Sequence, residues 1–228
     1  MSLASQSGKK INMKRIVIID DHPAIRDGLA TRISLEDDLE VCGGASDVND
    51  GLELIGEAQP DLAIVDISLK TGNGIDLIKQ AKEKYPDVKM LVWSMYDESL
   101  YAERVLRAGA MGYINKENVT DTIIQAIRTI LSGQVFLSED MSAKVLQGMV
   151  TGKRQADQSP VETLSDRELE TFQLMGQGLN TIDIAKRMHV SPKTVETYRT
   201  RIKEKIQVKD MAELMREATR WFLSLIHI

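Results

Sequence analysis

The sequence predicts a doubly wound α/β domain with a parallel sheet, followed by a smaller all-α region. Two observations support this prediction. Between residues 14 and 131, five short apolar runs alternate with stretches of helical period, which is typical of strand–helix units in a parallel sheet. Beyond residue 163, the apolar residues follow only the helical period. A chain of 228 residues is long enough for both regions.

The two regions differ in charge. Residues 14–133 hold 13 basic and 21 acidic side chains, whereas residues 160–228 hold 11 basic and 10 acidic ones. The net charge of −5 therefore comes from the first region. Such a split between halves indicates separate tasks.

The pattern of apolar residues predicts the position of each strand and helix in the α/β region. Its apolar runs, such as IVII, LAIV and MLVW, are nearly continuous, as expected for strands covered on both faces. The expected strands are 16–20, 40–45, 61–66, 88–94 and 112–115. The expected helices are 23–34, 48–58, 74–84, 98–108 and 119–131.

The rest of the chain is predicted to be helical apart from one polar linker, at 151–163. Before this linker, one more helix is expected over 138–150, with Ser138 as its N-terminal cap. Ser165 and Glu168 form a capping-box pattern, and Ser191 before Pro192 marks a helix that starts after a tight turn. Beyond the linker, a first helix is expected to start at the capping box in LSDRELE (164–170), and three more are expected over 181–188, 192–206 and 210–221. No structure is assigned to the apolar end FLSLIHI.

Composition disfavours several classes of protein. No apolar run approaches the roughly 18 to 20 residues that span a bilayer. The first 13 residues, which we interpret as a flexible leader, lack the apolar stretch of a signal peptide. The single cysteine, Cys42, cannot form an internal disulfide, and no Cys/His cluster predicts a zinc site. We therefore expect a cytoplasmic protein that does not act at a membrane.

Five polar side chains are expected at the carboxyl edge of the sheet. Asp20 and Asp21 follow the first strand, Asp66 ends the third, Ser94 ends the fourth, and Lys116 follows the fifth. Ligand sites of open parallel sheets lie outside the carboxyl ends of the strands, so these side chains should converge. Clustered carboxylates raise one another's pKa unless a cation compensates, and Mg²⁺ prefers hard oxygen ligands. Helix capping is an alternative explanation for Asp21 taken alone, but it does not explain all five side chains at one edge of the sheet. The sequence therefore predicts an acidic Mg²⁺ pocket.

This set of residues, in this order along the strands, resembles the receiver domain of two-component response regulators. The resemblance covers residues 14 to about 132. It implies a flavodoxin-like (βα)5 fold and a phosphoacceptor, Asp66, whose carboxylate takes a phosphoryl group from a histidine kinase. Self-phosphorylation and autodephosphorylation at Asp66 would then be the only chemistry, so we do not expect an enzyme.

The same resemblance implies roles for the other pocket residues. Mg²⁺ would be held by Asp20, Asp21 and Asp66, together with a backbone carbonyl near Ser68. Ser94 and Lys116 would bind the phosphoryl oxygens. Tyr113 occupies the family's aromatic switch position. Once the phosphoryl group is present, Ser94 would move toward it, and the Tyr113 side chain would then turn inward.

Residues 181–206 have the pattern helix, turn, helix that is typical of DNA readers. With the helices on either side they resemble the four-helix LuxR-type module over about 163–222. The matching motifs are Leu-Ser-x-Arg-Glu at 164–168 and Ser-x-x-Thr-Val-x-x-Tyr-x-x-x-Ile at 191–202, in which Tyr198 replaces the usual histidine. A receiver followed by this module resembles the NarL/FixJ-type response regulators.

Helical geometry divides residues 192–206 between two faces. The apolar stripe expected to face the module's core is Val195, Tyr198, Ile202 and Ile206. The residues expected to contact base edges are Glu196, Thr197 and Thr200. The residues expected to contact phosphates are Lys193, Thr194, Arg201 and Lys205. The near-neutral charge of this region predicts weak binding by one copy, so we expect a homodimer on DNA.

The expected function is a phosphorylation-controlled transcriptional regulator. Its domains would be a receiver at 14–132, a helix and linker at 133–162 and a DNA-binding module at 163–222. Its partners would be a sensor histidine kinase, double-stranded promoter DNA, a second copy of the chain and RNA polymerase. Two alternatives remain: a receiver that acts as a phosphate-independent docking module, and an aspartyl-phosphate phosphohydrolase. The latter is disfavoured because Ser68 stands where a second acid would be needed.

Overall fold

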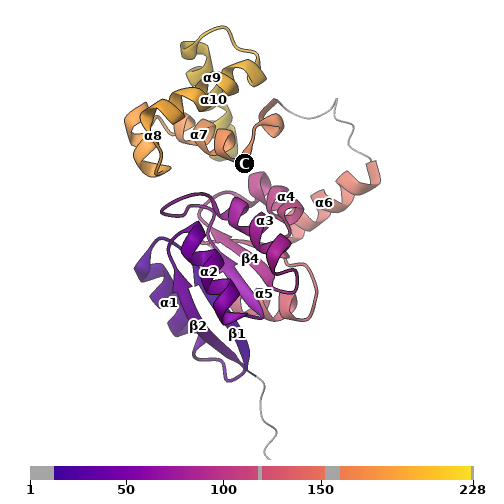
Figure 1. The fold of residues 1–228 in the computed structure, drawn as a ribbon. Coiled ribbons are helices and arrows are strands. Elements are labelled where there is room, and N and C mark those ends of the chain that lie inside the picture. Colours follow the sequence, from indigo (N-terminus) through magenta and orange to yellow (C-terminus); the bar gives the residue numbers. More distant parts are fainter. Residues whose placement is uncertain (1–12, 118–119, 152–159, 227–228) are drawn as a thin grey trace, which may run out of the picture.

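A computed structural model describes residues 13–117, 120–151 and 160–226 (Figure 1). The predicted leader up to residue 12 and most of the predicted linker, 152–159, lie outside the described residues. The described part contains a five-stranded parallel sheet flanked by helices, followed by a cluster of helices. The predicted fold class is therefore confirmed.

The strand order of the sheet is β2-β1-β3-β4-β5. The strands are β1 (Lys14–Ile19), β2 (Leu39–Ala45), β3 (Leu62–Val65), β4 (Lys89–Ser94) and β5 (Gly112–Asn115). From β1, the chain continues to β2 on one side and then crosses to β3 on the other side of β1. Open α/β sheets bind their ligands at the carboxyl ends of the strands beside such a switch point. Asp20 follows β1 and Asp66 follows β3.

Helices cover both faces of the sheet. The helices on one face are α1 (Pro23–Ile33) and α5 (Thr120–Leu131), and those on the other are α2 (Val48–Ala58), α3 (Gly74–Lys84) and α4 (Glu98–Ala108). Along β1, Ile16 and Ile18 enter one core while Val17 and Ile19 enter the other. All four side chains are buried, which explains why the apolar run is continuous.

The C-terminal region is entirely helical in its described part. Its elements are a 3-10 turn η2 (Pro160–Thr163), α7 (Asp166–Gly176), α8 (Thr181–Arg187), α9 (Pro192–Ile206) and α10 (Met211–Ile226). Ser165 and Glu168 form the predicted capping box on α7. Ser191 caps α9 by accepting the Thr194 amide at 3.1 Å, with Pro192 in the first turn. The predicted helix-turn-helix is thus α8 and α9.

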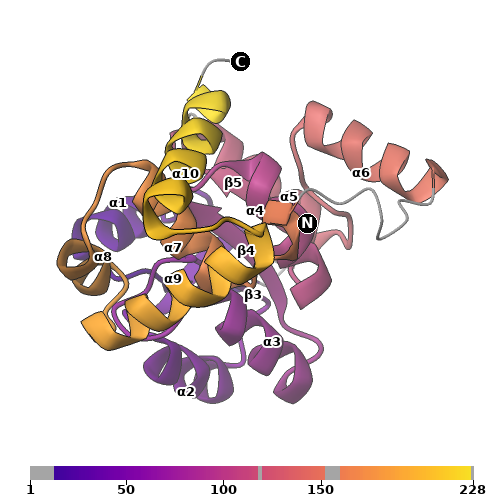
Figure 2. The same ribbon diagram turned by 90° about the horizontal axis from the view of Figure 1, so that it is seen from above.

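The helix α6 (Glu139–Thr151) lies between the two regions in sequence and projects from the α/β region (Figures 1 and 2). Its first turn is held as expected, because the Oγ of Ser138 accepts the Met141 amide at 3.1 Å. The Met141 side chain is buried.

The last helix extends beyond its predicted end and continues from Trp221 to Ile226. The helix that begins at the capping box ends at Gly176. Phe172 and Trp221, whose rings are 5.2 Å apart, pack α7 against α10. This tertiary contact favours helix where local sequence signals are weak.

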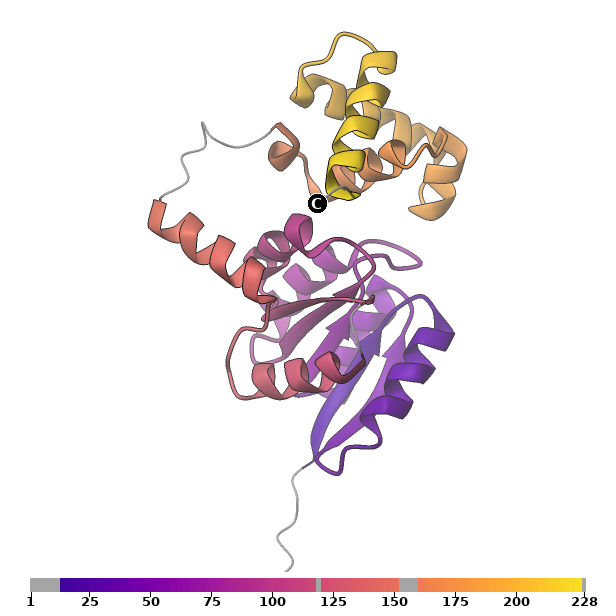
Figure 3. The ribbon, with the colours of Figure 1, turned by 180° about the vertical axis from the view of Figure 1, so that it is seen from behind.

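The C-terminal helices lie beside α3 and α4, at the carboxyl edge of the sheet (Figures 1 and 3). Among the described residues, no helix combines the length and the apolar character needed to cross a bilayer.

Candidate functional site

The acidic pocket is organised around one buried lysine. Asp20 and Asp66 are 2% and 4% exposed. The Nζ of Lys116 lies 2.5 Å from Oδ2 of Asp20 and 2.7 Å from Oδ2 of Asp66. The lysine therefore bridges the two carboxylates that the ends of β1 and β3 bring together, and its charge compensates for their burial.

Backbone contacts fix the loops that carry these side chains. The Asp66 amide donates to the Ile19 carbonyl at 2.8 Å, and the Lys116 amide donates to the Ser94 carbonyl at 2.8 Å. The loop after β3 turns tightly into α3 at Gly74, where a Cβ would lie 2.0 Å from the Asp66 carbonyl oxygen. Only a residue without a side chain fits there, so Gly74 sets the position of Asp66.

The protonation of Asp66 reflects competing effects. Burial raises the pKa of Asp66, the ammonium of Lys116 lowers it, and the nearby Asp20 raises it again; the balance lies above the ordinary value. A negative charge at this position is therefore unfavourable unless a cation stabilises it.

The donor atoms of the pocket fit a hard divalent cation. One ligand atom each from Asp20, Asp21, His22 and Asp66 lies within 4.8 Å of the others. Oδ1 of Asp66 is buried and accepts no hydrogen bond of normal geometry within the described part of the chain. Three carboxylates with a free, buried oxygen match the ligand preference of Mg²⁺.

His22 follows the aspartate pair directly in the chain. The structure places its Nδ1 2.6 Å from Oδ1 of Asp21, and its amide donates to Oδ1 of Asp20 at 2.8 Å. The only sequence signal for this position is its adjacency to the aspartate pair. His22 thus belongs to the rim of the acidic pocket.

Ser94 and Tyr113 lie on neighbouring strands of the same edge. Both are 1% exposed, and the Tyr113 Oη donates to the Tyr96 carbonyl at 2.6 Å. The Tyr113 side chain is therefore already inside, whereas we expected it to turn inward only after phosphorylation. Ser68 is half-buried in the loop after Asp66 and forms a β-bridge with Asn73.

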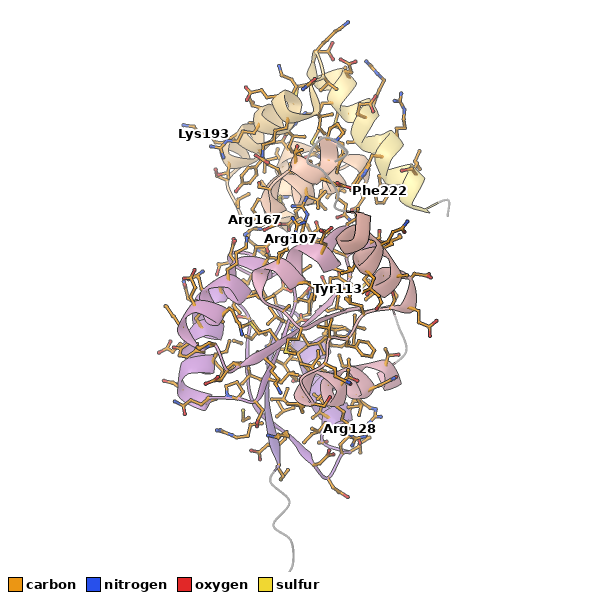
Figure 4. All side chains as sticks on the ribbon, turned by 90° about the vertical axis from the view of Figure 1, so that its right-hand side faces the viewer. Arg107, Tyr113, Arg128, Arg167, Lys193 and Phe222 are labelled. Atoms are coloured by element: carbon orange, nitrogen blue, oxygen red, sulfur yellow. The ribbon has the colours of Figure 1, made fainter. Side chains whose placement is uncertain are left out.

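The outward side of α9 is polar and open. Val195 and Ile202 are buried, while Tyr198 and Ile206 pack partly against the same core. Of the seven residues expected to contact DNA, Thr194 is partly buried and the others are exposed: Lys193, Glu196, Thr197, Thr200, Arg201 and Lys205. Figure 4 shows Lys193 pointing away from the body of the protein.

Two of these side chains already contact other helices of the protein. Oε1 of Glu196 accepts hydrogen bonds from Thr181 at 2.7 Å and from Arg199 at 2.9 Å. The Nζ of Lys205 lies 2.6 Å from Oε2 of Glu168, in the capping box of α7. Glu196 is thus held in place beside α8, and Lys205 must leave Glu168 before it can bind a phosphate.

Sequence patterns gave no sign of the contact between the two regions. On the outside, Asp166 of α7 accepts from Lys79 and from Arg104, each at 3.1 Å. In the interior, Glu170 accepts from Tyr96 at 3.1 Å. His189, in the turn before α9, has its Nε2 4.0 Å from Oδ2 of Asp21. The helical region therefore contacts the rim of the acidic pocket.

Comparison with known families agrees with this geometry. Residues 16–128 match the response regulator receiver domain, and residues 162–218 match the LuxR family of bacterial regulatory proteins. The acidic pocket falls in the first match, and α7 to α9 with the first half of α10 fall in the second.

Similar proteins cover nearly the whole chain. The oxygen regulatory protein NreC of Staphylococcus carnosus is 35% identical over 210 residues, which is 90% of this chain and 97% of NreC. NreC of Staphylococcus haemolyticus is 34% identical over the same shares.

Solved structures resemble both parts. A LuxR-family two-component response regulator from Aurantimonas sp. SI85-9A1 matches with a TM-score of 0.57 and 28% identity, covering 60% of this chain and 99% of that one. RcsB of Salmonella enterica serovar Typhimurium, bound to promoter P1flhDC in the presence of BeF3-, matches with a TM-score of 0.61. That match covers 92% of this chain and all of RcsB at 22% identity, so it supports the fold alone.

Proposed function

This chain belongs to the two-component response regulators that join a receiver domain to a LuxR-type DNA-binding domain, and from that premise we propose that Asp66 is its phosphoacceptor. As a member it is a phosphorylation-controlled DNA-binding regulator of transcription. The observation that supports Asp66 is its burial at the carboxyl edge of β3, with one oxygen on Lys116 and the other without a hydrogen bond. A carboxylate held in this way keeps one oxygen available for a bond to phosphorus and is compensated by a fixed cation.

The proposed reaction is a single phosphoryl transfer. A carboxylate oxygen of Asp66 forms a bond to phosphorus while the bond from phosphorus to the donor's imidazole nitrogen breaks. The electron pair of that bond stays with the imidazole, so the product is an acyl phosphate. Lys116 would compensate its added negative charge, and Ser94 would donate to a phosphoryl oxygen.

The residues that would hold Mg²⁺ are Asp20, Asp21 and Asp66, with a backbone carbonyl near Ser68. The bound ion would supply charge neutralisation for the transferring phosphoryl group. Lys116 already compensates part of the charge of Asp20 and Asp66. Tyr113 would transmit the change through Tyr96, because its hydroxyl already holds the Tyr96 carbonyl.

The proposed DNA-reading element is the outward face of α9. Glu196, Thr197 and Thr200 would contact base edges, with Glu196 accepting from a cytosine amino group. The proposed phosphate contacts are Lys193, Thr194, Arg201 and, after it leaves Glu168, Lys205. A single module of near-neutral charge binds weakly, which supports a homodimer over two half-sites.

We propose a sensor histidine kinase, promoter DNA and RNA polymerase as the other partners, in the cytoplasm. The domain bounds would be 14–132 for the receiver, 133–162 for the helix and linker, and 163–222 for the DNA-binding domain.

Two variants test this function. Asp66→Asn should abolish Mg²⁺-dependent labelling by acetyl phosphate and the phosphodonor-dependent gain in promoter protection measured by footprinting. Asp87→Asn, an exposed acid at the opposite edge of the sheet, should label as the wild type does. Full labelling of Asp66→Asn would refute the assignment, and promoter protection that ignores the phosphodonor would favour a phosphate-independent receiver.

A further inference from the structure

A polar cluster lies between α8 and α9, beside the proposed reading face. Its members are Thr181 at the start of α8 and two residues one turn apart on α9, Glu196 and Arg199. The Thr181 hydroxyl donates to Oε1 of Glu196 at 2.7 Å, and Nη1 of Arg199 donates to the same oxygen at 2.9 Å. Arg199 also donates to the Thr181 hydroxyl at 2.6 Å, so each of the three side chains contacts the other two.

Arg199 was not among the residues expected to contact DNA. Its side chain is 18% exposed, whereas that of Glu196 is 52% exposed. Its Nε is buried and donates no hydrogen bond within the described part of the chain. Two of its three nitrogen atoms are thus directed at the protein, which distinguishes it from the exposed Arg201, a proposed phosphate contact.

Helical spacing explains this position. Residues three or four apart on a helix lie on the same side, so Arg199 and Glu196 share a stripe that faces α8. Thr197 and Thr200 lie on the exposed outer side, and Tyr198 packs partly against the core. Arg199 therefore lies at the boundary between the core and the reading face, where it reaches Glu196 from the protein side.

The charge of Glu196 is a difficulty for a helix that binds DNA. The phosphates repel a carboxylate, since duplex DNA carries one negative charge per roughly 1.7 Å of its axis. Nη1 of Arg199 lies 2.9 Å from the carboxylate, so its positive charge offsets that repulsion. The two donors also fix the side chain before DNA binds, which reduces the conformational entropy that is lost on binding.

The direction of these hydrogen bonds favours one base. Within the described part of the chain, both hydrogen bonds to this carboxylate end on Oε1, so Oε2 is the oxygen that remains for a donor outside the protein. A carboxylate only accepts, and in the major groove cytosine presents an amino donor. Adenine presents its amino donor together with the acceptor N7, a pair that an amide satisfies better than a carboxylate.

We propose that Arg199 and Thr181 are positioning residues that determine the base preference of α9. They hold Glu196 so that Oε2 meets a cytosine amino group, and Arg199 offsets the charge that would otherwise keep the carboxylate away from DNA. Neither residue contacts the base itself. This inference rests on the proposed reading role of Glu196.

The test is a double-mutant cycle on the full chain, with Mg²⁺ and beryllium fluoride present. Glu196→Gln removes the charge but keeps the shape of the side chain, and Arg199→Met removes the guanidinium but keeps much of its length. The wild type, both single variants and the double variant select sites from a DNA library randomised over about 20 base pairs, enough for two half-sites one helical turn apart. Circular dichroism and thermal unfolding establish that every variant is folded.

The informative base pair is the one at which Glu196→Gln changes the selected base, with an expected change from cytosine to adenine. At that base pair, Arg199→Met should reduce the preference for cytosine over adenine by about fivefold or more, since a well-placed base contact discriminates to that extent. In the Glu196→Gln background the same substitution should change the preference by less than about twofold, because no carboxylate is left to position.

Thr181 provides an independent variant of the cluster. Thr181→Val removes the hydroxyl and should weaken the preference in the same direction, whereas Thr181→Ser keeps the hydroxyl and should retain the preference. Arg220→Met is the matched control, because Arg220 pairs with Glu217 on α10 at the same spacing of three residues. The control should keep the preference of the wild type.

Two outcomes overturn the inference. In the first, Arg199→Met leaves the preference for cytosine unchanged. In the second, Arg199→Met weakens binding to every sequence by the same factor in both backgrounds and lowers the slope of log K against log salt by about one, as expected for a direct phosphate contact.

Failure of the reading role gives a different pattern. If the wild type selects no site, or if Glu196→Gln changes the selected base at no position, α9 does not read DNA through Glu196, and the inference falls with that role. If Glu196→Gln changes one position while Arg199→Met changes none, the reading role stands and only the positioning role of Arg199 is refuted.

Discussion

Lys116 is the residue on which the unloaded pocket most depends. Its ammonium is the shared partner of Asp20 and Asp66, and all three side chains are at most 4% exposed. Lys116→Met leaves two buried carboxylates without a counter-charge, so we expect the free energy of unfolding of the receiver to fall by about 3 kcal/mol without divalent cations. Denaturant unfolding measures this change.

Mg²⁺ should restore part of that loss, because a bound cation replaces the missing charge. Lys82→Met is the control, since Lys82 is exposed and donates to the Pro86 carbonyl. Its effect should stay within about 0.5 kcal/mol. Equal losses in the two variants would contradict the electrostatic role of Lys116.

Two glycines give a matched pair of substitutions. A Cβ at Gly74 would lie 2.0 Å from the Asp66 carbonyl oxygen, whereas a Cβ at Gly28 in α1 would meet nothing within 4 Å. Gly74→Ala must displace the loop of Asp66, so unfolding free energy should fall by about 1–3 kcal/mol and the labelling rate should drop. Gly28→Ala should add up to about 1 kcal/mol and leave labelling unchanged. Normal labelling of Gly74→Ala would argue against its role in placing Asp66.

At the scale of elements, the start of α7 depends on its capping box. The Ser165 Oγ accepts the Glu168 amide, and the Glu168 carboxylate accepts the Ser165 amide at 2.8 Å and the Lys205 ammonium at 2.6 Å. Ser165→Ala should lower the stability of the DNA-binding domain by about 1 kcal/mol. Thermal unfolding followed by circular dichroism measures this, with Ser34→Ala after α1 as control. A null effect would mean that packing alone defines the helix start.

The same cap makes the domain sensitive to acid. Burial would raise the pKa of Glu168, but the hydrogen bonds from Lys205 and Ser165 outweigh it and hold the pKa below the ordinary value of 4.5. Stability from this group is thus present above pH 4.5 and is lost as the pH falls through the lowered value. Unfolding free energy measured against pH should fall less steeply in Glu168→Gln, and parallel curves would contradict this assignment.

Elements with strong local signals were predictable from sequence. Ser165 with Glu168, Ser191 with Pro192, and the continuous run of β1 each specify their structure within a few residues, and each was confirmed. The end of α10 was not, because contacts such as Phe172 with Trp221 join residues far apart in the chain. Convergence of Asp20, Asp66 and Lys116 followed from the topology of parallel sheets.

The details of the candidate site depend on side-chain geometry that topology does not specify. The inward position of Tyr113 results from one hydrogen bond to the Tyr96 carbonyl. The contact of Glu170 with Tyr96 joins residues 74 positions apart and belongs to two different domains. A glutamate inside an amphipathic helix gives no sequence signal that it will be buried.

At the scale of the whole molecule, the surface of the C-terminal region that contacts the receiver differs from the surface that is expected to bind DNA. The helix α7 packs against the receiver through Glu170, while the reading face of α9 stays accessible. The acidic receiver and the near-neutral DNA-binding domain then contribute differently to DNA affinity. Release of α7 would move the receiver's surplus negative charge away from the DNA phosphates.

The pH dependence of docking tests Glu170 in the intact chain. Burial raises its pKa above the ordinary 4.5, and Arg167 opposes this less strongly. The groups around it are Tyr96 and Asn73 from the receiver and Arg167 from α7, with Tyr101 stacked on Tyr96. Because the docked pKa is raised, docking is fully favourable below pH 4.5 and weakens as the pH rises through the raised value.

Small-angle scattering can follow this change, without divalent cations, as a radius of gyration that grows as the pH rises through the raised pKa of Glu170. Histidines also change charge in this range, so the decisive quantity is the difference between the wild type and Glu170→Gln. The amide cannot ionise, so this variant should stay compact to higher pH, and Glu103→Gln should follow the wild type. If Glu170→Gln expands over the same range as the wild type, the ionisation of Glu170 does not govern docking.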